Sequence, residues 1–278
     1  MIHLYHRTSR HCGKAVTETY STSFSAAVRL LHRDMRDDIY SLYGFVRVAD
    51  EIVDTFHDHD QRALLADFRK ETCHSIQRRL SLNPVLNGFQ LTVHKYNIPL
   101  DLVTAFFNSM EMDLYRDRHD CNSYSEYIYG SAEVVGLMCL RVFCEGGERE
   151  YQRLEPFARS LGAAFQKVNF LRDLGEDFRG LERSYFPGVN DGLLTEKDKR
   201  SIEEEIECDF RHAAAGIRQL PEKARLGVYV AYKYYLSLFQ KIQALSSDRI
   251  AGQRIRIPNY RKWLILAGAG LRQQFKLI

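Results

Sequence analysis

Two stretches, RVADEIVD (Arg47–Asp54) and NFLRDLGED (Asn169–Asp177), determine how this chain is interpreted. Each holds two aspartates that stand four residues apart: Asp50 with Asp54, and Asp173 with Asp177. This spacing places both carboxylates of a pair on one face of an α-helix. The residues between them are largely apolar, which favours helices that face a core. We therefore expect the acids to line an interior cleft.

The polar residues around each pair favour a metal site, although acids at this spacing more commonly form a solvated surface. Asn169 precedes Asp173 by one turn and adds a neutral oxygen to the stripe. Oxygen ligands of this kind suit Mg²⁺, which takes one or two carboxylates together with substrate phosphates. Arg47 and Arg172 stand beside the two pairs, and guanidinium groups suit phosphate oxygens. The residues therefore predict an enzyme that acts on a diphosphate.

The composition is that of a globular, cytoplasmic protein. The 278 residues are 45% hydrophobic and 27% charged, enough to bury a substantial core. A formal net charge of +3, without a basic run interleaved with aromatic residues, argues against nucleic acid as a partner. The six cysteines are scattered and form no CxxC pair, so we expect reduced thiols and no zinc site.

Sequence patterns for membrane insertion are weak. No stretch reaches the roughly 18 apolar residues of a span, and the N-terminus lacks the apolar core of a signal peptide. The nearest candidate, WLILAGAGL (Trp263–Leu271), follows four basic residues: Arg254, Arg256, Arg261 and Lys262. We expect a buried terminal helix there, with a peripheral contact at the inner membrane surface as the alternative.

The chain is predicted to be helical nearly throughout, because the period-two alternation of strands is absent. Six helices are expected, with prolines and capping residues marking most starts and with Ser123 or Ser125 capping the third. They span residues 34–56, 99–115, 123–142, 156–180, 196–217 and 222–245. No repeat or linker divides the chain. The simplest interpretation is one all-α domain, residues 1–278, with a central cleft between antiparallel helices.

Five motifs follow one another along most of the chain, from about Thr19 to Leu266. They are YSTSF (residues 20–24), YGFVRVADEIVD (43–54), SMEMDL (109–114), YIYGSAEVVGLM (127–138) and FQKVNFLRDLGEDFRGLERSYFP (165–187). In this order they resemble the squalene/phytoene synthases, which join two prenyl diphosphates head to head; the last motif is the most specific. The resemblance implies an isoprenoid-synthase-type helical bundle.

The resemblance also implies roles for individual residues. The metal ligands would be Asp50, Asp54, Asn169, Asp173 and Asp177. The substrate-binding residues would be Ser21, Ser23, Tyr43, Arg47, Val135, Gly136, Gln166, Asn169, Arg172, Arg183, Tyr185 and Tyr234. The four aspartates, Arg47 and Tyr129 would act in catalysis. For the two serines the alternative role is helix capping, and for the tyrosines it is core packing.

Four residues within these motifs carry further expectations. Ala132 and Glu133 stand where the family commonly has Ala-Gly, so we expect an altered pocket shape there. Glu51 stands where many members have Asp and can still bind a metal or pair with a cation. Gly136 lies inside a predicted helix, where glycine costs about 1 kcal/mol relative to alanine. That cost favours a close approach of backbone or ligand at this position.

By resemblance, we expect two geranylgeranyl diphosphates to give 15-cis-phytoene through a cyclopropyl (prephytoene) diphosphate, the first committed step of carotenoid biosynthesis. Mg²⁺ or Mn²⁺ would serve as cofactor, and NADPH would not be required. Dehydrosqualene, squalene or presqualene diphosphate from two farnesyl diphosphates are the alternatives. Remoter ones are a cyclase-like or hydrolysing enzyme with a single substrate, and a catalytically silent pathway partner. Downstream carotenoid enzymes are further expected partners.

Overall fold

All regular structure is α-helical or π-helical in the part of the chain that the computed structural model describes. That part comprises residues 1–116, 118–181, 185–189, 194–252, 255–258 and 264–269, with the backbone alone described for 176–181 and 251. The elements are α1 (Ile2–Tyr20), α2 (Thr22–Val28), α3 (Arg33–Asp54), α4 (Gln61–Arg78), α5 (Pro84–Tyr96), α6 (Leu100–Met112), α7 (Cys121–Ile128), the π-helix η1 (Tyr129–Glu133), α8 (Val134–Phe143), α9 (Glu148–Leu181), α10 (Glu196–Ile217), α11 (Glu222–Gln243) and α12 (Ser247–Gly252). The all-α prediction is confirmed.

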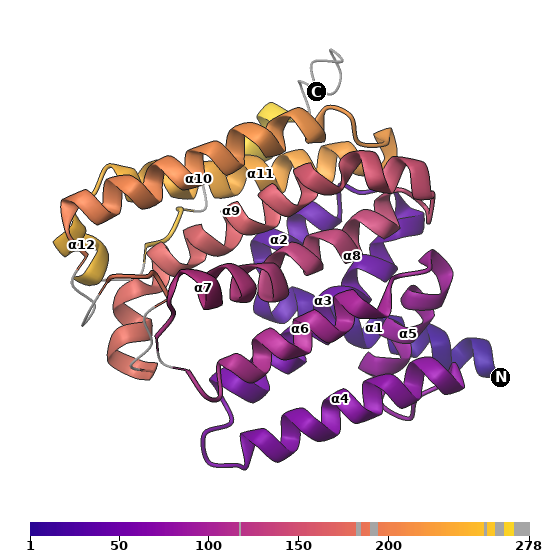
Figure 1. Cartoon of the computed structure of the whole chain (residues 1–278). Coiled ribbons are helices and arrows are strands. Elements are labelled where there is room, and N and C mark those ends of the chain that lie inside the picture. The colour runs from indigo at the N-terminus through magenta and orange to yellow at the C-terminus, as the bar shows by residue number, and fades with distance from the viewer. Residues whose placement is uncertain (117, 182–184, 190–193, 253–254, 259–263, 270–278) are drawn as a thin grey trace.

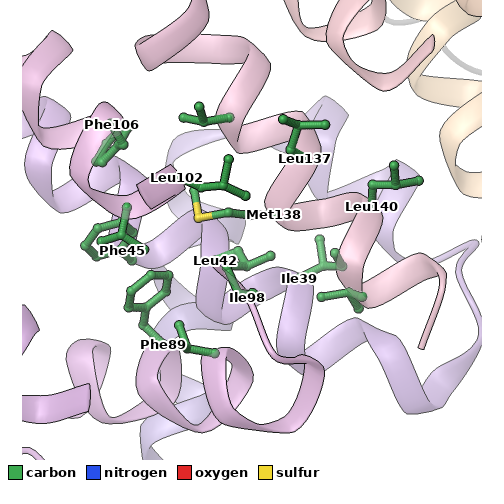
Figure 2. Packing of buried hydrophobic residues seen from close by; sticks show 14 of the residues in the cluster. Ile39, Leu42, Phe45, Phe89, Ile98, Leu102, Phe106, Leu137, Met138 and Leu140 are labelled. Atoms are coloured by element: carbon green, nitrogen blue, oxygen red, sulfur yellow. The ribbon is translucent and has the colours of Figure 1, made fainter. Parts of the chain in front are cut away.

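The larger hydrophobic core forms where α3, α5, α6 and α8 meet (Figure 2). Along α3 the buried residues recur at helical spacing, and Phe45 lies at their centre. Its ring stacks on Phe89 of α5 with the centroids 3.8 Å apart, and Phe106 of α6 packs at 5.3 Å. Met138 of α8 is also fully buried in this core. Large aromatic side chains bury much apolar area, so this contact fixes α3 against its neighbours.

Helix α8 contacts both α3 and α9, and it runs antiparallel to each (Figure 1). On the α9 side, Ala132 faces Gly162 and Gly136 faces Ala158. Because α3 and α9 are both antiparallel to α8, they run in the same direction. The expected cleft lies between antiparallel helices where α8 faces α3 and α9, whereas the two acidic helices are parallel to each other. Their C-terminal halves, which carry the acids, lie at the same end of the molecule.

A second core joins α7, α9, α10 and α11. A buried cation reinforces it: Lys167 of α9 is 7% exposed and pairs with Asp209 of α10 at 2.7 Å, and also with Glu205. Burying a charge without a partner is costly. This paired lysine therefore ties α9 to α10 in one arrangement.

The single helix predicted over residues 123–142 is divided into three parts. The N-terminal cap of α7 is Asp120, not Ser123 or Ser125. The Asp120 carboxylate accepts a hydrogen bond from the Ser123 backbone N–H at 2.8 Å. In return, the Ser123 Oγ atom accepts one from the Asp120 backbone N–H at 3.0 Å, which completes a capping box. The five-residue π-helix η1 then separates α7 from α8. π-Helical turns are rare and are found frequently at functional sites.

Glycines allow the close approach of η1 and α8 to α9. A Cβ added to Gly162 would lie 2.6 Å from the Ala132 carbonyl oxygen, and one added to Gly136 would lie 3.0 Å from that of Ala158. Side chains at these positions would push the backbones apart. The expected close approach at Gly136 is confirmed, and the neighbouring element is the backbone of α9.

Helix α9 begins eight residues before the predicted start at Pro156. A proline inside a helix removes one hydrogen bond and crowds the preceding turn. Here the first turns are retained because Tyr151 and Leu154 are buried in the core and Glu148 pairs with Arg141 at 2.6 Å. The boundaries predicted for the helices that became α3, α6, α10 and α11 agree with the structure to within three residues.

The buried terminal helix expected at Trp263–Leu271 lies only partly within the described residues. Residues 264–269 are helical, with Leu264 66% exposed and Ala269 buried, whereas Trp263 and Leu271 lie outside the described part. Among the described residues, no helix has both the length and the apolar character needed to cross a bilayer.

All six cysteines are free thiols. Burial raises the pKa of Cys139 to about 12, so this thiol stays protonated.

Replacing Gly162 with alanine should destabilise the protein, because the added methyl group meets the Ala132 carbonyl oxygen. We expect Gly162→Ala to lower the free energy of unfolding by about 1–3 kcal/mol, measured by urea denaturation. Gly252→Ala is the control, since nothing lies within 4 Å of a Cβ there. Equal urea midpoints for the Gly162 variant and the wild type would contradict the close packing.

Candidate active site

A cavity of about 1070 Å³ runs between α2, α3, η1, α8, α9, α10 and α11. Along α3 its lining changes from Ile39 and Leu42 to Asp50 and Asp54. Along α9 it changes in the same direction, from Leu154 to Asp173. The remaining walls at the far end are apolar, supplied by α2, α10 and α11. The cavity therefore has one acidic end and one apolar end.

The first acidic pair is held by an arginine. Arg47 donates to Asp50 with a nitrogen–oxygen distance of 2.5 Å and also pairs with Glu51. Its guanidinium group lies 4.4 Å from the ring centroid of Tyr20, in cation–π geometry. Glu51 thus pairs with a cation, one of the two roles that its sequence position left open.

In the second acidic stretch, too, an arginine pairs with an aspartate. Arg172 Nε donates to both oxygens of Asp173, at 2.9 and 3.0 Å, and its terminal nitrogen contacts the same carboxylate. Asn169 lines the cavity one turn earlier, beside Tyr235. The Asn169 Oδ1 atom is buried and has no hydrogen-bond partner among the described residues. The side chain of Asp177 lies outside them.

Two tyrosines lie between the acidic stretches and show that these stretches are close together. Burial raises the pKa of Tyr43, Arg47 opposes the rise, and Asp50 and Tyr235 add to it. Burial likewise raises the pKa of Tyr235, Arg172 opposes that rise, and Asp173 adds to it. Because each phenol lies near one acidic stretch and the two phenols lie near each other, the two acidic stretches are close together. Both remain protonated donors at neutral pH.

The donor set fits a divalent cation. Asp50, Asp54, Asn169 and Asp173 offer hard oxygens that line one end of the cavity. The orphaned amide oxygen of Asn169 lacks the partner that a buried acceptor normally has. Among the described residues, no three histidine, cysteine, aspartate or glutamate side chains form a ready-made cluster. These residues would hold a metal together with oxygens of a bound diphosphate.

Most of the predicted site residues line this cavity. They are Ser21, Ser23, Tyr43, Arg47, Asp50, Asp54, Val135, Gly136, Gln166, Asn169, Arg172, Asp173, Tyr185 and Tyr234. The capping role expected as the alternative for Ser21 is confirmed, because it caps α2 by accepting from the Phe24 N–H at 3.3 Å, and its role in substrate binding remains a prediction. Arg183 lies outside the described residues, so its assignment remains a prediction.

The assignment of Tyr129 needs correction. Tyr129 is not part of the described cavity lining, and the Arg159 guanidinium lies 5.2 Å from its ring. The phase of the helix gives the reason: Tyr127, Ser131 and Val135 follow at intervals of four and face the cavity, whereas Tyr129 is out of step. Glu133 pairs with Arg159 at 2.6 Å, outside the lining, so its bulk does not enter the pocket.

Tyr127 is a lining residue that the sequence interpretation did not assign to the site. Its hydroxyl donates to Asp113 at 2.8 Å, and Tyr185 also contacts Asp113, at 3.4 Å. Burial raises the pKa of Tyr127 well above its usual value, and the carboxylates of Asp113 and Asp54 add to the rise. The hydroxyl is therefore a fixed neutral group near the first acidic pair. The spacing of four residues between Tyr127 and Ser131 is the sequence signal that places Tyr127 on the same helix face as the cavity lining.

Comparison with known proteins identifies the family. Residues 17–190 match the family model described as squalene/phytoene synthase. The chain belongs to this family. It is an enzyme of the prenyltransferase class, and the family implies prenyl diphosphates as substrates.

Individual relatives extend the comparison. The chain is 26% identical to the 15-cis-phytoene synthase of Paracoccus sp. over 297 residues, which covers 94% of each chain. It is 27% identical to the chloroplastic phytoene synthase 3 of Zea mays over 281 residues, but spans only 65% of that relative's length. A crystal structure of a dehydrosqualene synthase with ligand has the same fold, with a TM-score of 0.80 and 20% identity over 97% of this chain and 98% of that one.

Removing either acidic group should abolish turnover without unfolding the protein. We expect Asp50→Ala and Asp173→Ala each to lower kcat by ~10²–10³-fold or more, a loss typical of charge-stabilising groups, while far-ultraviolet circular dichroism is unchanged. Asp67→Ala, on the exposed face of α4, is the control and should keep full activity. Retained turnover in both cavity variants would refute the assignment of the acids.

Proposed function

We propose that the chain is a phytoene synthase that condenses two geranylgeranyl diphosphates to 15-cis-phytoene. The observation that carries this proposal is the shape of the cavity, which joins both acidic stretches at one end to a long apolar remainder. A volume of about 1070 Å³ exceeds the ~300–1,000 Å³ of an ordinary small-molecule pocket, which suits two long prenyl chains. The names of the phytoene synthase relatives support the longer substrate.

The residues of the acidic end would bind and orient the diphosphates. Arg47 and Arg172 carry permanent charges suited to phosphate oxygens, and Ser21 and Ser23 offer hydroxyl donors. When bound, Mg²⁺ or Mn²⁺ at Asp50, Asp54, Asn169 and Asp173 would neutralise the leaving diphosphate. No reductant is required, because the final step of the proposed reaction is a proton loss.

The apolar remainder of the cavity would protect the reactive carbons from water. The carbon–oxygen bond of one substrate breaks, and the diphosphate leaves with the electron pair. The resulting allylic cation is attacked by the C2–C3 double bond of the second substrate, and proton loss closes a cyclopropylcarbinyl diphosphate. That intermediate ionises, rearranges and loses a proton to give the triene. Aromatic walls such as Phe165 and Tyr235, stacked 3.9 Å apart, exclude nucleophiles along this path.

The alternative is the synthesis of dehydrosqualene or squalene from two farnesyl diphosphates, and a dehydrosqualene synthase has the same fold. Purified protein incubated with Mg²⁺ and either geranylgeranyl or farnesyl diphosphate, with and without NADPH, separates these by product mass. We expect a C40 hydrocarbon from the geranylgeranyl substrate, independent of NADPH. A C30 product alone would identify the enzyme as a dehydrosqualene synthase, or as a squalene synthase if NADPH were required. Release of prenyl alcohol alone would overturn head-to-head coupling.

We also propose a cytoplasmic location with a peripheral contact at an anionic membrane surface, because a C40 hydrocarbon must leave into lipid. The face that fits lies at the start of α1 and in the α4–α5 loop, near the N-terminal end in Figure 1. There the hydroxyl of Tyr5 donates to the Ser81 carbonyl at 2.7 Å. The neighbours Leu4 and Leu82 are 59% and 91% exposed, and the adjacent cations are Arg7, Arg78 and Arg79.

Each basic residue near an anionic surface contributes about 1 kcal/mol. Wild type should therefore sediment with vesicles of phosphatidylcholine and phosphatidylglycerol, and not with phosphatidylcholine alone. The double variant Leu82→Ser with Arg78→Glu should lose most of this binding, while Leu64→Ser, an exposed change elsewhere on α4, should not. Equal sedimentation of the double variant and wild type would remove this face from the proposal.

A further inference from the structure

Asp113 belongs to SMEMDL (residues 109–114), a motif to which the proposed reaction gives no role. Its carboxylate accepts hydrogen bonds from two phenols, those of Tyr127 at 2.8 Å and Tyr185 at 3.4 Å. These tyrosines stand 14 and 72 residues from Asp113 in the chain and belong to two other motifs. One buried carboxylate therefore joins three of the five sequence motifs.

The fold places this carboxylate where a negative charge is unfavourable. Asp113 is only 7% exposed, and removing a carboxylate from water costs free energy. It also directly follows the last residue of α6, where the helix dipole disfavours an anion. A carboxylate at such a position needs an explanation from the groups that it holds.

The two phenols form one wall of the cavity together with Phe170. Tyr127, Phe170 and Tyr185 all line the cavity, and we refer to these three side chains as the aromatic wall. The ring of Tyr185 stacks on Phe170 with the centroids 4.1 Å apart, and the Tyr127 centroid lies 5.2 Å from that of Tyr185. Phe170 directly follows Asn169 on α9, so the aromatic wall lies at the acidic end of the cavity.

Asp113 and His119 lie behind the aromatic wall. Both are buried, and neither is part of the described cavity lining. The His119 ring packs against the two phenols, with its centroid 5.0 Å from that of Tyr127 and 5.7 Å from that of Tyr185. Because both hydroxyls donate to Asp113, their protons are directed out of the cavity. The aromatic wall is thus anchored from behind by its hydroxyl groups.

An anchored aromatic wall at this place suits a prenyl cation. Aromatic rings attract cations, and the attraction is stronger where water is excluded. Hydrogen bonds polarise one another in a low-dielectric interior, so a phenol that donates to a carboxylate gains electron density. Position matters as much as charge, because a displacement of about 1 Å at a reacting centre can cost about 100-fold in rate.

We propose that Asp113 is a positioning residue, which acts through Tyr127 and Tyr185 to hold the aromatic wall against the allylic cation of the proposed reaction. Asp113 itself lies outside the cavity and does not touch the substrate. Without this anchor the rings shift and water reaches the cation. Water then adds to the cationic carbon and loses a proton, which gives a prenyl alcohol in place of the coupled hydrocarbon. The proposal rests on the proposed function in requiring an allylic diphosphate that ionises, and it applies to C15 and C20 substrates alike.

The test measures kcat, KM and the ratio of prenyl alcohol to coupled hydrocarbon with the preferred prenyl diphosphate. For Asp113→Ala we expect kcat to fall about 10–100-fold, KM to stay within about twofold, and the share of alcohol to rise. Asp113→Asn, which keeps an acceptor oxygen without the charge, should lie between Asp113→Ala and wild type. Glu111→Ala is the matched control, because Glu111 is exposed on the same helix two residues earlier and should not affect rate or products.

A combined variant separates positioning from a merely structural role. Asp113→Ala leaves two buried hydroxyls without this acceptor and should lower Tm, so a loss of activity alone would not distinguish the two roles. The double variant Tyr127→Phe with Tyr185→Phe keeps both rings but removes the hydroxyls, and it should also raise the share of alcohol. Adding Asp113→Ala to this double variant should lower kcat by less than about twofold further, because residues that act through one another have non-additive effects.

Three results would overturn the proposal. They are wild-type kcat and products in Asp113→Ala, equal rates in Asp113→Asn and Asp113→Ala, and a loss from Asp113→Ala that is as large in the double variant as in wild type. If Asp113→Ala does not fold, the double variant decides, and wild-type products from it would overturn the proposal. Absence of both hydrocarbon and prenyl alcohol from wild type would overturn the proposed function and, with it, this proposal.

Discussion

The arrangement of the cavity depends on holding several carboxylates at one end of an apolar chamber. Like charges placed close together repel each other, and burial strengthens that repulsion. Arg47 and Arg172 offset it, each paired with an acid of its own stretch. An arginine cannot lose its charge, so this compensation holds at any physiological pH. The acidic end is therefore stable before any ligand arrives, and a diphosphate can bind between groups that are already in place.

This charge arrangement requires α3 and α9 to be parallel, and the packing of η1 and α8 provides that. Glycines at 130, 136 and 162 remove the side chains that would separate the backbones. Backbones that approach so closely permit only a narrow range of relative positions, because interiors are packed to near-crystalline density. The same contacts also fix the π-helical turn. One set of glycine contacts thus positions the turn and the helix that carries the second acidic stretch.

The sequence revealed the acidic stripes and the helices that carry them, because both signals are local. A four-residue spacing is sufficient to place Asp50 and Asp54 on one face, and apolar periodicity is sufficient to predict α3. The start of α9 was missed because Tyr151 and Leu154 are buried by distant parts of the chain, which outweighs the local effect of Pro156. The spacing of Tyr127 and Ser131 indicates a shared face, but the sequence does not reveal that a π-helical turn begins at Tyr129. That turn depends on tertiary contacts to α6 and α9.

The two ends of the cavity are specified by different parts of the chain, and this separates chemistry from substrate length. The acids come from motifs in α3 and α9, whereas the apolar far end is assembled from single residues of α2, α10 and α11. A substitution at the far end changes the room available to a prenyl chain without altering the charges that ionise it. Under the proposed function, the bulk of far-end side chains such as Leu31 and Ile217, rather than the aspartates, would determine the length of prenyl chain that fits.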